Sequence, residues 1–151
     1  MTAQPMPAAT AFADDDLLAR FLDTTLPTAA FHHADHVRMA WLFVMRHGMP
    51  AALELFPAAL ERFAAAKGAT GLYHATITWA YLLLIHERQQ RSPAGSWPAF
   101  AAANPDLLSW KPSALDRLYT PDTLRSDLAR RTFVMPDRLS AAPLPPPPAS
   151  P

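Results

Sequence analysis

The chain contains 151 residues, of which 50% are hydrophobic and 17% are charged, and its 13 Lys and Arg residues balance 13 Asp and Glu residues. This length corresponds to a single domain that can bury a sizeable core. A net charge of zero argues against a nucleic-acid-binding protein, which would carry a basic excess. The absence of cysteine excludes disulfides, thiolate metal sites and cysteine nucleophiles.

Both ends of the chain are expected to be loose, and residues 14–138 are expected to form the helical domain. Residues 1–13 have no Lys, no Arg and no apolar core, so they predict a flexible N-terminus rather than a secretory signal. Residues 139–151 are rich in proline, which predicts an extended, disordered tail. The longest apolar stretch, Ile77–Ile85, is shorter than the ~20 residues of a membrane span. We therefore expect a soluble cytoplasmic protein with no membrane partner.

The first half of the domain predicts two helices. Three consecutive acidic residues precede apolar residues at helical spacing, which indicates an amphipathic helix over 15–24. A second helix ends at His47, before a glycine. Its start lies between residues 29 and 35, with Thr28 or Asp35 as alternative N-caps.

Two further long helices are predicted in the middle of the chain. One covers about 50–67, and Pro57 inside it must kink or divide it, since proline removes a backbone donor. The other covers about 71–91 and is apolar on nearly every side, which places it at the centre of the fold.

Shorter elements follow in the last third of the domain. Helices are expected to begin at Trp97 and near Lys111, and a third to begin at Pro121, capped by Thr120, and to run to about Arg131. Phe133–Pro136 is expected to be an extended segment packed on the body. No segment shows sustained strand alternation, so the predicted fold is all-α: a single-domain bundle of about four longer helices with short C-terminal helices.

Histidines are the residues most suited to form a site. Of the six in the chain, His33 and His36 lie three residues apart, so on a helix both approach the apolar stripe that contains Val37 and Trp41. His74 shares a predicted face with Ile77 on the central helix. Two helices therefore direct three imidazoles toward apolar surroundings, where each ring needs a polar partner.

A shared metal ion is one way to satisfy these rings. Three neutral imidazoles suit a divalent transition metal (Zn, Fe, Ni or Cu) and leave one position open for water, so hydrolase or transferase chemistry on a small-molecule substrate becomes accessible. The predicted ligands are His33, His36 and His74. Further ligands or hydrogen-bonding neighbours are expected among His32, Asp35, Thr78, His86 and Glu87, and the predicted lining residues of the pocket are Trp41, Trp79 and Tyr81.

Two metal-free alternatives stay open. In one, the same histidines are hydrogen-bonded core residues of a non-enzymatic helical interaction module. In the other, the protein is a sensor of a small ligand. The sequence predicts neither the oligomeric state nor whether the protein is an enzyme.

Two sequence blocks resemble a small bacterial all-α family. Its first block has the pattern Phe-x-His-x-x-His followed by Ala-Trp, here Phe31 to Trp41, and its second has the pattern Tyr-His-x-Thr-Ile-Thr, here Tyr73 to Thr78. The resemblance covers about residues 20–137 and implies an all-α fold but no activity.

The chain is also loosely similar in architecture to the DinB-like metal-binding four-helix bundles. That similarity implies a divalent metal held by three histidines from different helices, with thiol-dependent transferase or hydrolase activity. In those bundles a His-x-x-x-His pair follows the single histidine, whereas here the pair His33 and His36 precedes His74.

Overall fold

The computed structural model describes residues 12–138, and within this range it contains helices and no strand. The predicted all-α, single-domain fold is confirmed. The Pro-rich segment 139–151 and most of the predicted N-terminal segment lie outside the described residues. The elements are α1 (Asp14–Leu22), η2 (Thr28–Ala30), α2 (His33–His47), α3 (Met49–Ala66), α4 (Ala75–Arg91), α5 (Trp97–Ala103), α6 (Pro105–Leu108), η3 (Ala114–Arg117), α7 (Pro121–Arg125) and α8 (Asp127–Arg131).

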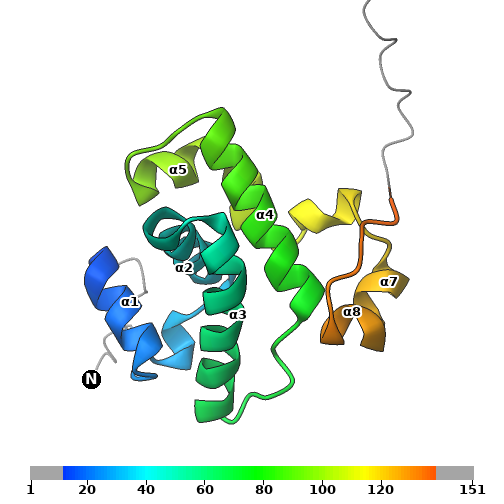
Figure 1. Cartoon of the computed structure of the whole chain (residues 1–151), viewed down its shortest axis with the longest axis horizontal. Helices are drawn as coiled ribbons and strands as arrows, with labels where there is room; N and C mark the ends of the chain where they lie inside the picture. Colours follow the sequence, from blue (N-terminus) through cyan, green and yellow to red (C-terminus); the bar gives the residue numbers. More distant parts are fainter. Residues whose placement is uncertain (1–11, 139–151) are drawn as a thin grey trace, which may run out of the picture.

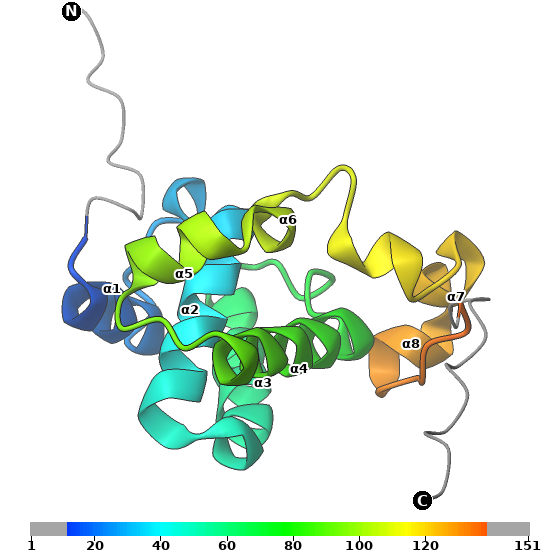
Figure 2. The ribbon, with the colours of Figure 1, turned by 90° about the horizontal axis from the view of Figure 1, so that it is seen from above.

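Helices α2, α3 and α4 form the centre of the molecule, and each of them contacts the other two. Helix α1 packs on α2 and α3 at one end, and α8 packs on α4 at the opposite end (Figure 1). Helices α5 and α6 lie over α2 when the molecule is seen from above (Figure 2). Among residues 12–138 no helix combines the length and the apolar character that crossing a membrane requires.

Aromatic packing joins α1 to this centre. The Phe21 ring of α1 is 1% exposed, and its centroid lies 5.4 Å from that of Phe31 and 5.2 Å from that of Phe63. Phe43 and Phe56 complete the cluster at 6.2 and 6.1 Å. Such pairs stabilise a fold beyond the area that they bury, so this cluster fixes α1 against α2 and α3.

The three acidic residues at the start of α1 each pair with an arginine. Asp14 accepts hydrogen bonds from the buried Arg38 of α2, with an Nη2–Oδ1 distance of 2.7 Å. Asp15 pairs with Arg46 near the end of α2, and Asp16 pairs with Arg20 one turn along α1. Asp14 and Asp15 therefore orient α1 on α2, whereas the pair of Asp16 lies within α1.

Two histidines stand immediately before helices. Helix α2 begins at His33 with His32 as its N-cap residue, so neither Thr28 nor Asp35 has that position. Helix α4 begins at Ala75, four residues later than expected, and His74 is its N-cap rather than a residue of its buried face. Helix α3 continues without division through Pro57, whose side chain is buried.

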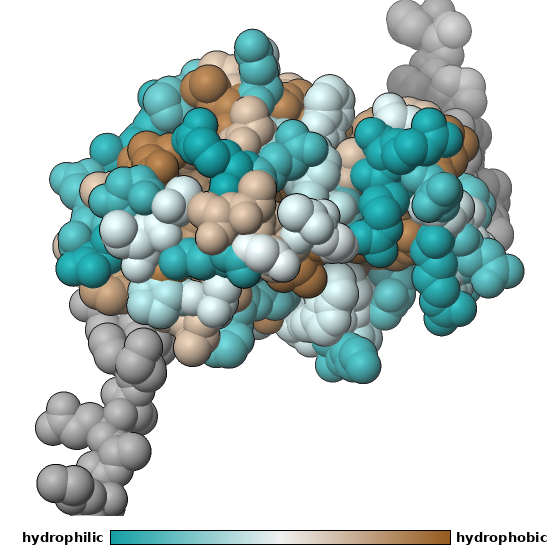
Figure 3. All heavy atoms as spheres, turned by 90° about the horizontal axis from the view of Figure 1, so that it is seen from below, coloured by the Kyte–Doolittle hydropathy of each residue, from teal (hydrophilic) through white to brown (hydrophobic). Residues whose placement is uncertain are grey.

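The C-terminal layer, residues 114–138, consists of short helices and an extended segment. The helix predicted from Pro121 to Arg131 is divided at Ser126, because this serine has an extended backbone and its Oγ accepts the Ala129 N–H of the next helix at 3.1 Å. The segment after α8 packs as expected: Trp79 and Phe133 stack with centroids 5.7 Å apart, and Tyr119 donates to the Val134 carbonyl at 2.7 Å. Hydrophilic side chains gather over this end of the molecule (Figure 3).

Candidate functional site

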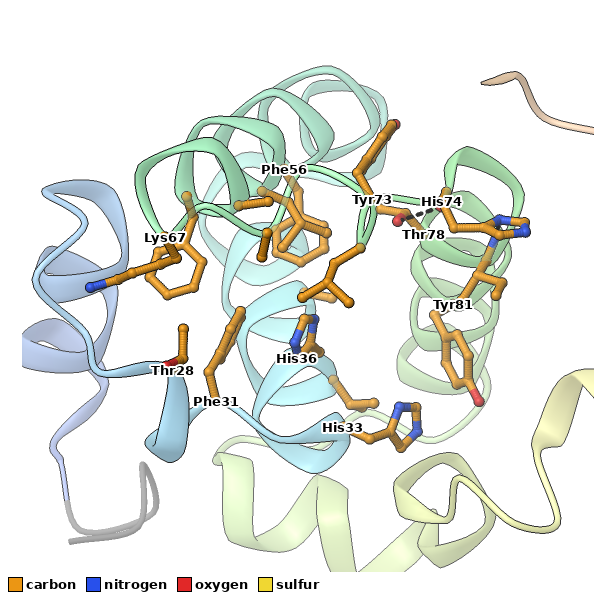
Figure 4. A pocket seen from close by; sticks show the side chains of 18 of the residues that line it. Thr28, Phe31, His33, His36, Phe56, Lys67, Tyr73, His74, Thr78 and Tyr81 are labelled. Atoms are coloured by element: carbon orange, nitrogen blue, oxygen red, sulfur yellow. Dashed lines mark hydrogen bonds between the residues drawn. The ribbon is translucent and has the colours of Figure 1, made fainter. Parts of the chain in front are cut away.

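A pocket of about 430 Å³ lies between α2, α3 and α4. Figure 4 shows His36 and Phe31 near its middle and Lys67 and Thr28 at one side. Pockets that bind small molecules have about 300–1,000 Å³ and mostly apolar walls with few polar groups, and this pocket has both properties. Its lining consists of Thr28, Phe31, His33, His36, Val37, Ala40, Phe56, Leu60, Phe63, Ala64, Lys67, Ala69, Leu72, Tyr73, His74, Ile77, Thr78, Tyr81 and Trp110.

The three predicted ligand histidines all line this pocket, but they face different partners. His74 uses both ring nitrogens: Nδ1 accepts the Ile77 N–H at 3.2 Å, and Nε2 donates to the Leu124 carbonyl at 2.7 Å. A carbonyl only accepts, so the proton is on Nε2. The ring extends away from the middle of the pocket (Figure 4) and joins the start of α4 to α7.

His33 is tied to a different backbone carbonyl. Its Nε2 donates to the Leu107 oxygen at 2.9 Å, and its ring lies 5.1 Å from the rings of both Tyr81 and Trp110. Burial lowers the pKa of His33, and the bond to Leu107 opposes this effect. At neutral pH the ring is therefore neutral, and its Nδ1 carries a lone pair.

His36 is the polar side chain nearest the middle of the pocket. Its ring stacks on Phe31 with centroids 3.8 Å apart and planes 17° apart. Burial, followed by repulsion from a charged His33, lowers the pKa of His36 to about 4, and the backbone of Phe31 opposes the shift. Its imidazole is therefore neutral in the physiological range, and because one ring nitrogen interacts with the Phe31 backbone, one nitrogen is left for a ligand.

Two further predicted residues also line the pocket. The Thr78 hydroxyl donates to the His74 carbonyl at 2.8 Å, which strengthens the first turn of α4. Tyr81 lies one turn further along α4, and its hydroxyl is 3.1 Å from the Ser113 hydroxyl. Burial raises the pKa of Tyr81, so its hydroxyl keeps its proton at neutral pH.

Trp41 and Trp79 do not line the pocket, although the sequence predicted that they would. Trp41 packs against Trp97 and donates to the Gln89 side chain at 3.2 Å, which docks α5 on α2. Trp79 stacks on Phe133. Each tryptophan covers another element of the fold, and the partner is distant in sequence in both cases.

The remaining predicted neighbours lie outside the pocket lining. His32 is exposed, and its backbone N–H donates to the carboxylate of Asp35 at 2.9 Å, so Asp35 caps the start of α2. Glu87 is exposed and pairs with Arg91. His86 is half-buried on α4.

Most of the other lining residues were not among the predicted site residues, and three of them lie outside the long helices. Lys67 follows the last residue of α3, while Leu72 and Trp110 are 74% and 49% exposed at the pocket. All three belong to connections between helices, where hydrophobic periodicity carries no information. No sequence pattern distinguishes a lysine or an exposed tryptophan at a pocket from the same residue elsewhere on the surface.

No group of three His, Asp or Glu side chains in the described part of the chain is arranged to hold a metal ion. No protein-family model, curated protein or solved structure matches the chain. The resemblance to the bacterial all-α family and the similarity to the DinB-like bundles therefore stay predictions.

Proposed function

We propose that the protein binds an apolar, planar small molecule in the pocket between α2, α3 and α4. The observation that carries this proposal is an open pocket of about 430 Å³ whose walls are aromatic and aliphatic and whose middle contains a neutral imidazole. Aromatic rings favour offset-stacked or edge-to-face contacts with another ring. A neutral His36 can orient such a ligand through one hydrogen bond without the cost of burying a charge. The cysteine-free composition fits a cytoplasmic location.

Filling the pocket from one wall tests this proposal. Ala64 on α3 is 5% exposed and lines the pocket, so Ala64→Leu places an isobutyl group in the ligand's space. Ala58 lies on the exposed side of the same helix, and Ala58→Leu is the matched control. The probe is 2-naphthol, which is a neutral two-ring aromatic, titrated calorimetrically.

We expect 2-naphthol to bind the wild type and the Ala58→Leu protein equally, and to bind the Ala64→Leu protein at least about tenfold more weakly, a loss of about 1.4 kcal/mol. Equal binding to all three proteins, or binding to none, contradicts the proposal. Circular dichroism before titration verifies that each variant is folded.

A divalent-metal site is the second candidate, because His33, His36 and His74 all line the same pocket. Metal binding by all three through Nε2 requires His33 and His74 to give up their bonds to the Leu107 and Leu124 carbonyls. Metal analysis of protein purified without a histidine tag, followed by Zn²⁺ titration, tests this candidate. It predicts stoichiometric metal that His74→Asn abolishes, since asparagine keeps an N-cap acceptor while removing the ring. Substoichiometric metal that the substitution leaves unchanged contradicts it.

A further inference from the structure

The charge around the pocket points to the chemical class of its ligand, and this inference rests on the proposed binding function. Among the described lining residues, Lys67 is the one lysine or arginine, and none is acidic. The half-buried Lys67 side chain favours an anionic partner at this side of the pocket and opposes a cationic one.

The surroundings of Lys67 leave its ammonium available to a ligand. Lys67 takes part in none of the ion pairs found within residues 12–138. Its Nζ lies 5.6 Å from the ring centroid of Phe63, which is a wall residue of the pocket. The ammonium therefore lies at the edge of the pocket, in a cation–π contact with one of its wall residues.

Three polar groups, two carbonyls at the end of α3 and the Asp23 carboxylate, already have other partners. The carbonyls of Ala64 and Ala65 at the end of α3 accept the N–H groups of Ala69 and Gly68, at 2.8 and 3.1 Å. The carboxylate of Asp23 accepts both the hydroxyl and the N–H of Thr25, and these bonds account for most of the lowering of its pKa, to which Lys67 contributes least.

None of the other polar groups of the lining carries a negative charge. His74 and Thr78 direct their hydrogen bonds to the backbone, and His33 donates to Leu107. Lys67 and Thr28 lie on the same side of the pocket, and the flexible Lys67 side chain ends at the outer edge of that side (Figure 4). We propose that the ligand is an aromatic monocarboxylate whose ring system lies against the aromatic wall and whose carboxylate pairs with Lys67.

A charged and an uncharged probe of the same shape test this proposal. The probes are 2-naphthoate and 2-naphthamide, titrated calorimetrically at pH 7 and low salt. Lys67→Met removes the ammonium and keeps an apolar side chain. Arg62→Met is the control, because it removes an exposed positive charge from the same helix outside the pocket lining.

We expect wild-type protein to bind 2-naphthoate about tenfold more tightly than 2-naphthamide. Lys67→Met should weaken 2-naphthoate by about tenfold and leave 2-naphthamide within about twofold, while Arg62→Met changes neither. Added sodium chloride should weaken only 2-naphthoate.

Equal affinities for the two probes, or a Lys67→Met protein that keeps the preference for the anion, overturn the carboxylate proposal. In that case 2-naphthol binding that is sensitive to Ala64→Leu still supports the pocket as an apolar binding site. If none of the naphthalene probes binds, the proposed function and the ligand class fail together.

Discussion

The helical body and the C-terminal layer are held together in different ways. In the body, α1 to α4 bury large side chains against one another, and the Phe21 cluster is the densest example. In the C-terminal layer, α7 and α8 have five residues each, too few for a stable isolated helix. Side-chain caps and hydrogen bonds to backbone carbonyls hold these short helices on α4, as Ser126 and His74 illustrate. The body therefore depends mainly on packing, whereas the layer combines the packing of Leu115 and Tyr119 with caps and hydrogen bonds that its short helices need.

The largest effect is expected from the body. Phe21→Ala removes the central ring of its aromatic cluster and leaves a cavity, so the free energy of unfolding should fall by about 3–5 kcal/mol. Chemical denaturation of the variant measures this loss. A decrease below about 1 kcal/mol would mean that α1 is not packed as an integral part of the body.

The second effect is a pH dependence of the body through His36. The pKa of His36 is about 4 in the folded chain and about 6.5 when unfolded, so the unfolded chain binds the proton first as the pH falls. The stabilisation is complete above about pH 6.5 and is lost progressively as the pH falls through 6.5 toward 4, below which the loss levels off. From pH 7 to pH 5 it amounts to about 2 kcal/mol.

His36→Phe removes this titration and keeps an aromatic ring beside Phe31. Denaturant unfolding of both proteins at pH 7 and pH 5 measures the part of the pH dependence that comes from His36, because His33 and His32 are present in both. Parallel losses of stability in the wild type and the variant would show that His36 is not held neutral.

Where α4 contacts the C-terminal layer, Thr76 provides the next test. Its hydroxyl donates to the Thr132 carbonyl at 2.8 Å and accepts the Val134 N–H at 3.1 Å, while its side chain is fully buried. Thr76→Val keeps the shape and leaves both backbone groups without this partner, at a cost of about 1–2 kcal/mol. Hydrogen exchange should accelerate at Val134 and leave the amides of α2 unchanged. Uniform acceleration throughout the chain would instead mean that the layer and the body unfold as one unit.

The smallest effect concerns Asp137, which is exposed. It accepts the Thr120 N–H at 2.9 Å and the hydroxyls of Thr120 and Thr123 at 2.7 Å each. The bonds from Thr123 and then Thr120 lower the pKa of Asp137 to about 2. The contact therefore stabilises the layer above about pH 4 and is lost as the pH falls toward 2.

Asp137→Asn should remove the part of the layer's stability that is lost on acidification. Amide exchange at Thr120, followed from pH 5 to pH 2, should show a step in the wild type that the variant lacks. The same step in both proteins would assign the titration to another carboxylate.

The same contrast explains how much of the structure the sequence predicts. The four longer helices follow from the spacing of apolar residues, which shows which face of a single helix is buried. The extended segment at Phe133 can be predicted in the same way. The position of His74 does not follow, because histidine is not a typical N-cap and its second partner, Leu124, is 50 residues away. The division at Ser126 does not follow either, because a serine between charged residues can lie within a helix as well as cap one.

For the candidate site, spacing places His33 and His36 toward one pocket but does not reveal what each ring nitrogen contacts. The carbonyls of Leu107 and Leu124 belong to other elements, and only the tertiary fold brings them to the rings. Trp41 and Trp79 show the same limit: their apolar faces predict burial but do not distinguish a pocket wall from a helix contact.

The half-exposed indole of Trp110 gives the protein a natural optical reporter. Its ring lies at the pocket and 5.1 Å from His33, whereas Trp41 and Trp97 are buried against each other. A bound ligand would displace water from around the Trp110 indole, and the less polar surroundings would shift its fluorescence emission to shorter wavelength. Occupancy can therefore be followed in unlabelled protein, in real time, from the colour of its own fluorescence.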